Sequence, residues 1–97
     1  MQRYIATIKF TQQGISNIKE TCQRAEAFKS AAKSMGVEVV DIYWTLGPFD
    51  GLLVLDAPDE ATVTAAMLQL GTQGNVETQT SRAFNASEMG SITSKLS

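Results

Sequence analysis

The sequence predicts a small α+β domain in which a four-stranded antiparallel sheet carries two helices on one face. Two observations predict it. The apolar positions switch along the chain between a period of two and a helical period, and the resulting order of segments is strand, helix, strand, strand, helix, strand. The 97 residues are a common size for one domain. Its core is thin, because a chain this short buries only about two-thirds of the surface that its unfolded form exposes.

Residues 4–10 alternate between two faces like a strand, and Thr11 is a plausible N-cap for the segment that follows. Helical spacing then continues to Gly36, a residue suited to a helix C-terminus. Gly14 weakens the first turn, so this helix is prone to break in two. The apolar stripe comprises Ile15, Ile18, Cys22, Ala25, Phe28, Ala32 and Met35. We therefore expect the Cys22 thiol to be buried and inert.

Residues 37–46 and 52–55 form the next two strands. If the first of these is regular, one of its faces carries Val37, Val39, Tyr43 and Thr45, and the other carries Val40, Ile42, Trp44 and Leu46. The run Leu52-Leu53-Val54-Leu55 is apolar on both faces, which is typical of a strand covered on both sides. Two helices cover only one face of a sheet. We therefore expect a second copy of the chain to cover the other face.

Pro58, Asp59 and Glu60 open the second helix, because proline and acidic residues suit the first turn. Its buried stripe comprises Val63, Ala66, Met67 and Leu70. Residues 76–84 form the last strand, with Val76, Thr78, Thr80, Arg82 and Phe84 on one face. Asn85 or Ser87 can cap a short final helix, which Gly90 weakens, so we expect it to fray or to dock on a partner. This βαββαβ order is the ferredoxin-like arrangement.

The composition excludes several classes of function. The chain has no histidine, which removes Ser-His-Asp and Cys-His nucleophiles and imidazole metal sites. A single cysteine forms neither an internal disulfide nor a cysteine zinc site. Eight scattered basic residues and a net charge of −2 argue against nucleic-acid binding. No segment is apolar for long enough to cross a bilayer or to resemble a signal peptide, so we expect a cytoplasmic protein. We also expect neither a metal nor a cofactor.

The candidate site lies at the turn between the second and third strands. Two glycines, a proline and an aspartate interrupt the apolar runs there, and the rings of Tyr43, Trp44 and Phe49 accompany the carboxylate of Asp50. Asp50 in an apolar setting can act as a general base or bind an amine. The stronger interpretation is that Asp50 caps the turn by accepting hydrogen bonds from backbone amides.

Tyr43 and Trp44 are expected to point to opposite faces of their strand, mainly as core or dimer-interface side chains, with the lining of a pocket as the alternative. Arg82 needs either a carboxylate partner or an anionic ligand if its face is interior to a dimer. Asp50 and Asp41 are the candidate partners. A structural salt bridge is the favoured role of Arg82, and an anion site is the alternative.

Several stretches of the sequence resemble the GYD domain family. They are Phe10-Thr11-Gln12-Gln13-Gly14-Ile15, Asn17-Ile18-Lys19, Arg24-Ala25-Glu26-Ala27-Phe28, Tyr43-Trp44-Thr45-Leu46-Gly47, Ala57-Pro58-Asp59, and Gly74-Asn75-Val76 with Thr78, Thr80 and Arg82-Ala83-Phe84. The resemblance covers nearly the whole chain in the right order. It implies one domain over residues 1–97, the ferredoxin-like fold and the dimeric α/β-barrel arrangement, in which two sheets pack face to face.

The family's Gly-Tyr-Asp signature corresponds to Gly47-Pro48-Phe49-Asp50 in this chain. Phe49 replaces the tyrosine, so no phenol hydroxyl is present at that position, and Pro48 replaces a residue that is usually polar or charged. A role in packing or in orienting Asp50 is compatible with both changes. The resemblance implies a fold and an assembly but no chemistry.

Three classes of function fit these observations. The leading one is a homodimeric small-ligand-binding or regulatory module, with a pocket between the sheet and the helices near Asp50. Tyr43, Trp44, Phe49, Asp50 and Arg82 are its candidate binding residues. The second is a cofactor-independent isomerase or oxygenase in which Asp50 is the base. The third is an assembly protein whose apolar sheet face serves only for packing, as a dimer or a higher oligomer.

Overall fold

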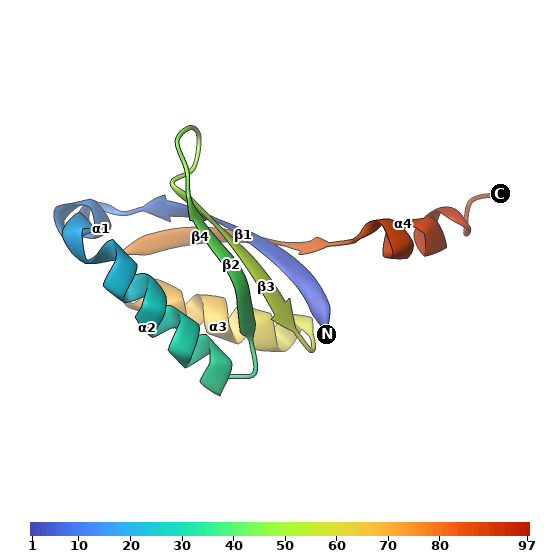
Figure 1. Cartoon of the computed structure of the whole chain (residues 1–97), viewed down its shortest axis with the longest axis horizontal. Coiled ribbons are helices and arrows are strands. Elements are labelled where there is room, and N and C mark those ends of the chain that lie inside the picture. The colour runs from blue at the N-terminus through green and yellow to red at the C-terminus, as the bar shows by residue number, and fades with distance from the viewer.

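A computed structural model describes all 97 residues and shows a four-stranded antiparallel sheet with helices on one face (Figure 1). The elements in order are β1 (Gln2–Phe10), α1 (Gln12–Ser16), a 3₁₀ turn η1 (Ile18–Glu20), α2 (Thr21–Ser34), β2 (Glu38–Trp44), β3 (Gly51–Ala57), α3 (Glu60–Thr72), β4 (Val76–Ala83) and α4 (Ala86–Thr93). The strand order in the sheet is β2-β3-β1-β4. The predicted ferredoxin-like βαββαβ fold is confirmed.

The core lies between the sheet and the helices α2 and α3. In the middle of the sheet, Tyr4 pairs with Leu55 and Ala6 pairs with Leu53, and all four side chains are buried. The helices close this layer with Phe28 and Ala32 from α2 and with Val63, Ala66 and Met67 from α3. No polar or charged residue is buried. The fold is therefore held by one apolar layer, and the opposite face of the sheet carries no helix (Figure 1).

A β-bulge in β2 corrects the expected assignment of its faces. The pairing shifts between Val39 and Asp41, so Val40 is an extra residue relative to β3. Val39 then pairs with the buried Leu55, and Ile42 pairs with the buried Leu53. The regular alternation that places Val39 and Ile42 on opposite faces is wrong. The extra residue lets β2 turn both side chains toward the helices.

The expected break in the first helix is confirmed, although it lies at Asn17 rather than at Gly14. Thr11 caps α1 as predicted, because its Oγ1 accepts a hydrogen bond from the amide of Gly14 at 3.1 Å. Gly14 packs directly against the turn before β4, where a Cβ atom would overlap the carbonyl oxygen of Asn75. Glycine is therefore required there for a close approach of two backbones.

The Cys22 side chain is exposed, which corrects the expectation of a buried thiol. The break at Asn17 restarts the helix at Thr21, so the apolar stripe of α2 does not continue that of α1. Phe28 and Ala32 are the buried side chains of α2, while Ile15, Ile18 and Met35 are all at least one-third exposed. Successive side chains in a helix are rotated by about 100°. Residues beyond a helix break therefore no longer lie on the face that a continuous stripe predicts.

The uncovered face of the sheet has an apolar centre and charged ends. Val54 on β3 lies between Ile5 and Asp41, and Leu52 lies between Thr7 and Tyr43. At one end of this face, Arg3 donates to Asp56 at 2.6 Å and holds the pKa of that carboxyl below its ordinary value. Ile5 and Tyr43 are exposed, so this face presents apolar surface to solvent.

The last helix, α4, extends away from the body of the domain after β4 (Figure 1). Asn85 and Glu88 form a capping box at its start, so of the two candidate caps, Asn85 and Ser87, it is Asn85 that caps the helix. Its apolar side chains Met89 and Ile92, and Leu96 beyond its end, are exposed. None of the helices is long and apolar enough to traverse a bilayer.

Candidate functional site

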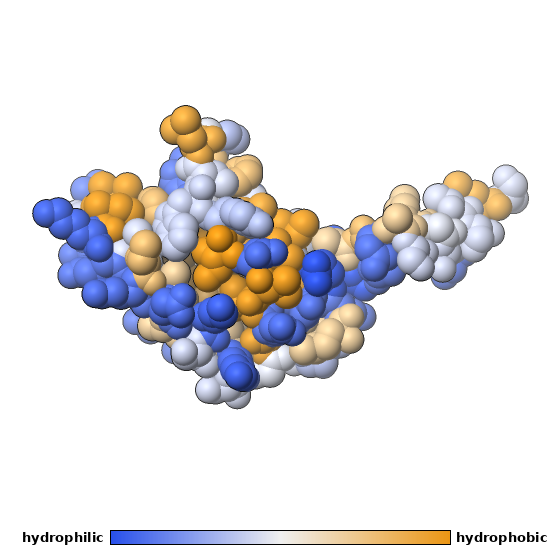
Figure 2. Space-filling model, in the orientation of Figure 1, coloured by the Kyte–Doolittle hydropathy of each residue, from blue (hydrophilic) through white to orange (hydrophobic).

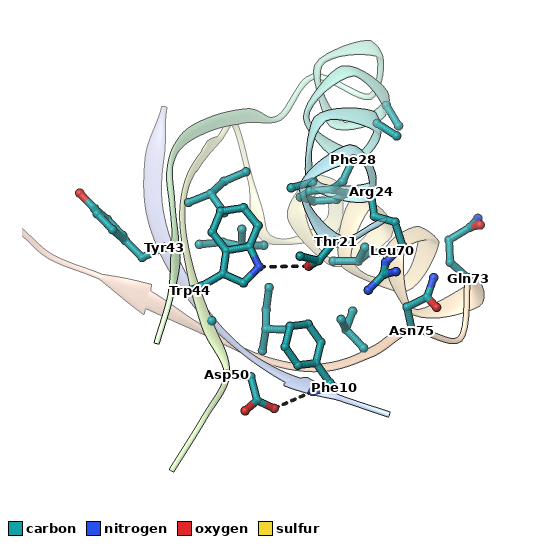
Figure 3. Close-up of a pocket in the computed structure, with 18 of the residues that line it drawn as sticks. Phe10, Thr21, Arg24, Phe28, Tyr43, Trp44, Asp50, Leu70, Gln73 and Asn75 are labelled. Carbon is teal, nitrogen blue, oxygen red and sulfur yellow. Dashed lines mark hydrogen bonds between the residues drawn. The ribbon is translucent and has the colours of Figure 1, made fainter. Parts of the chain in front are cut away.

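A cavity of about 310 Å³ lies between the helix-covered face of the sheet and α2 (Figure 3). Small residues create it. Gly51 stands between Ile8 and Trp44 in one cross-strand row, so the middle of that row has no side chain. Helix α2 contributes Ala25, Ala27 and Ala31 to the lining. The larger apolar walls are Ile8, Phe10, Phe28, Ile42, Trp44, Leu53, Leu70 and Val76.

Trp44 forms one wall of the cavity and ties β2 to α2. Its Nε1–H donates a hydrogen bond to Thr21 Oγ1 at 3.0 Å (Figure 3). The indole is 47% exposed, so it lies at the boundary between the cavity and solvent. Tyr43 borders the cavity, but its ring points away from it to the other side of the strand. The two rings therefore point to opposite faces, as expected from their adjacent positions in a strand.

Asp50 lines the cavity and also fixes the turn before β3. Its Oδ2 accepts a hydrogen bond from the amide of Phe10 at 2.9 Å, and its own amide donates to the carbonyl of Ile8 at 2.7 Å. Its carbonyl oxygen accepts from the amide of Thr45 at 2.9 Å. This is the arrangement of a capping aspartate. The carboxylate holds the end of β1 to the start of β3.

Phe49 lies outside the cavity lining. Its carbonyl accepts a hydrogen bond from Thr45 Oγ1 at 2.7 Å, and its side chain is half-buried in the loop that projects above the sheet (Figure 1). Leu46 in the same loop is fully exposed, and Figure 2 shows an apolar tip on the projecting loop. Of the three candidate rings, only the Trp44 ring forms a wall of the cavity.

Arg82 lies far from Asp50 in the sheet, next to Tyr4 near the start of β1. Its guanidinium pairs with Glu88 at 3.2 Å and lies 4.6 Å from the centre of the Phe84 ring. The expectation that Asp50 or Asp41 is the partner is wrong. Asp50 contacts Phe10, which pairs with Val76 at the opposite end of β4. Asp41 is on the other edge strand, β2, and on the uncovered face of the sheet. The amide of Asn85 and then Arg82 lower the pKa of the Glu88 carboxyl. Arg82 therefore anchors α4 to the sheet.

The polar end of the cavity was not predicted. Arg24, Gln69, Gln73 and Asn75 line it together, from α2, from α3 and from the turn before β4. Asn75 is held in place because its Oδ1 accepts a hydrogen bond from Gln13 Nε2 at 3.1 Å. The sequence contains one indication that Arg24 lies at the cavity. Arg24 precedes Phe28 by four residues, so the two side chains share a face of α2.

The family model of the GYD domain matches residues 4–93. The chain belongs to the GYD domain family. It is 33% identical over 90 residues to the glutamine synthetase and cystathionine beta-lyase binding protein of Thermus thermophilus, covering 92% of this chain and 95% of that protein. The expected family assignment is confirmed.

Solved structures support the fold alone, because the identities are low. The crystal structure of MtbAldR superposes with a TM-score of 0.68 at 13% identity, over 87% of this GYD domain protein and 52% of that chain. This chain therefore spans about half of MtbAldR. TTHA0845 from Thermus thermophilus superposes with a TM-score of 0.58 at 22% identity, over 89% and 96% of the two chains.

The Asp50 hydrogen bond gives a stability test. Asp50→Ala removes the acceptor of the Phe10 amide, so we expect it to lower the free energy of unfolding by about 1–2 kcal/mol. Asp50→Asn keeps a carbonyl oxygen at the same place and should lose less than half of that. Urea denaturation measures both, with Glu26→Ala as a control at an exposed carboxylate. Equal losses in the two Asp50 variants would contradict this role for the carboxylate.

Proposed function

We propose that this GYD domain protein is a homodimeric module that binds a small molecule in the cavity between the sheet and α2. The cavity carries the proposal. At about 310 Å³ it is at the small end of the roughly 300–1,000 Å³ typical of ligand sites. Its walls are mostly apolar, with a few polar groups gathered at one end, which is the usual composition of such sites. An exposed free thiol at Cys22 is compatible with a cytoplasmic location, which is part of the proposal.

Binding is favoured over catalysis by the chemistry of the lining. Asp50 is the one carboxylate that lines the cavity, and the lining contains neither cysteine nor histidine. One of its oxygens is already engaged by the Phe10 amide. The alternative, a cofactor-independent isomerase or oxygenase, would use Asp50 as its base. In that case Asp50→Asn would retain the fold and abolish turnover of the substrate.

The homodimer part of the proposal is supported by the uncovered sheet face. Two of its cross-strand rows hold Ile5, Val54, Leu52 and Tyr43, together with Thr7 and Asp41, and no element of the same chain covers them. In a symmetric dimer, the same face of a second copy would pack against this one about a two-fold axis and bury these side chains. This contact would enlarge the thin core of a short chain.

The cavity proposal is tested by native mass spectrometry of the purified protein with a pooled metabolite library. We expect the protein to retain one small mass. Leu70→Trp should abolish this retention, because Leu70 lines the cavity and a larger ring fills it. Leu68→Trp is the matched control, since Leu68 lies on the same helix and is 67% exposed. Retention that is unaffected by Leu70→Trp would place the ligand elsewhere.

The dimer is tested by Val54→Glu, with Leu68→Glu as the control outside the proposed contact. A second carboxylate beside Asp41 in the middle of the interface has no cationic partner there, so it should raise the dissociation constant of the dimer by at least about a hundredfold. Light scattering coupled to size-exclusion chromatography measures the mass of each variant over a dilution series. A wild-type protein that is monomeric at every concentration would refute this part of the proposal.

A second candidate function is binding to another protein. The Thermus relative is named for binding two enzymes, and α4 supplies an exposed apolar strip made of Met89, Ile92 and Leu96. Figure 2 shows apolar side chains along this extension, apart from the body of the domain. The ion pair between Arg82 and Glu88 links the helix to β4, and the capping box stabilises its first turn, so the strip is presented on a folded helix.

The two enzymes in the relative's name, a glutamine synthetase and a cystathionine β-lyase, are the first partners to test. Met89→Ser with Ile92→Ser should weaken binding of the dimer to such an enzyme more than tenfold in surface plasmon resonance. Its free energy of unfolding should change by less than about 0.5 kcal/mol, because these side chains are exposed. Ser87→Ala with Ser91→Ala is the control on α4. Wild-type protein that binds neither enzyme would argue against this second function.

A further inference from the structure

Arg24 is a half-buried cation at the wall of the cavity and has no carboxylate partner. The ion pairs of the chain are Arg3 with Asp56 and Arg82 with Glu88. The Arg24 guanidinium donates to two carbonyl oxygens, those of Asn17 at 2.6 Å and Gly14 at 3.4 Å. A guanidinium has five N–H donors, so three of them remain for another acceptor. A charge held beside an apolar cavity is costly unless an anion or water satisfies it.

The surroundings of Arg24 favour an anion over a cation. Gln73 and Asn75 carry neutral amides at the same end of the cavity, and Figure 3 shows the Arg24 side chain extending toward Asn75. Asp50, the one acidic group of the lining, is drawn on the other side of the Phe10 ring. The cavity therefore has a positive end and an apolar interior, made by Phe28, Leu53 and their neighbours.

We propose that the ligand is a small carboxylic acid with a single apolar ring or short chain. Its carboxylate accepts hydrogen bonds from Arg24, which suits a planar, bidentate contact. Its apolar part lies among Phe28, Ile42 and Leu70, and contacts the indole of Trp44. This inference rests on the proposed ligand-binding function and adds the chemical class of the ligand.

The bonds to Gly14 and Asn17 also give Arg24 a structural role, since they satisfy carbonyl oxygens at the end of α1. If Arg24 had only this structural role, the protein would bind an acid and the corresponding amide with the same affinity. A matched pair of probes therefore separates the two roles without any change to the protein.

The experiment titrates the dimer at pH 7 with 4-phenylbutyrate and, separately, with 4-phenylbutyramide. Trp44 is the single tryptophan and lines the cavity, so its fluorescence and its indole N–H resonance report binding directly. We expect the acid to bind roughly tenfold to a hundredfold more tightly than the amide. Equal affinities would overturn the proposed ligand class while leaving the cavity as a binding site.

Arg24→Gln should reduce the acid to the affinity of the amide, and Arg24→Lys should retain part of the preference. Lys29→Gln is the control, since it removes the same charge from an exposed position on α2. Thermal unfolding of each variant shows whether the domain is intact. A preference that persists in Arg24→Gln would overturn the role of Arg24. If neither probe binds and no library compound is retained in native mass spectrometry, both the ligand class and the ligand-binding function are wrong.

Discussion

The close contact between Gly14 and the carbonyl of Asn75 is the constraint from which the rest of the site follows. It brings α1 against the turn before β4, and Thr11 adds hydrogen bonds to Gly74 and Asn75 there. Beyond this contact, α1 ends at Ser16 and α2 begins at Thr21. The restart places Thr21 where the Trp44 indole reaches it, and it places Arg24 where its guanidinium reaches back to α1.

The cavity exists because two departures from regular packing occur in the same part of the sheet. The bulge at Val40 keeps Ile42 and Trp44 on the helix-covered face, whereas an unbroken alternation would turn them away from the Val39 side. Gly51 then leaves the centre of the Ile8–Trp44 row without a side chain. Large walls with an empty centre are what a ligand site requires, and a packed core would have a branched side chain at that position.

Features that depend on local sequence patterns are predictable from the sequence. The face on which a side chain lies beyond a helix break or a β-bulge is not. The sequence predicts Thr11 as one cap and Asn85 or Ser87 as another, because a cap depends on a few neighbouring residues. A bulge or a helix break is a tertiary outcome that reverses the faces of everything beyond it. A regular pattern therefore predicts a buried Cys22 and opposite faces for Val39 and Ile42, and the structure contradicts both. The sequence does not reveal the ion-pair partner of Arg82, because strand register determines which residues lie beside it. It does not reveal the role of Arg24 either, because the direction of this side chain depends on where α2 begins.

Strand β2 connects the two proposed contact surfaces through consecutive residues. The Trp44 ring forms a wall of the cavity, and the Tyr43 ring lies on the uncovered sheet face. Their backbones share one peptide unit, and β3 pairs with both through Gly51 and Leu52. A ligand that moves the indole therefore acts on the same piece of backbone that positions a side chain of the proposed dimer contact. If the two proposed contacts exist and binding shifts the indole, any coupling between cavity and open face passes through this peptide unit, and it works equally in both directions.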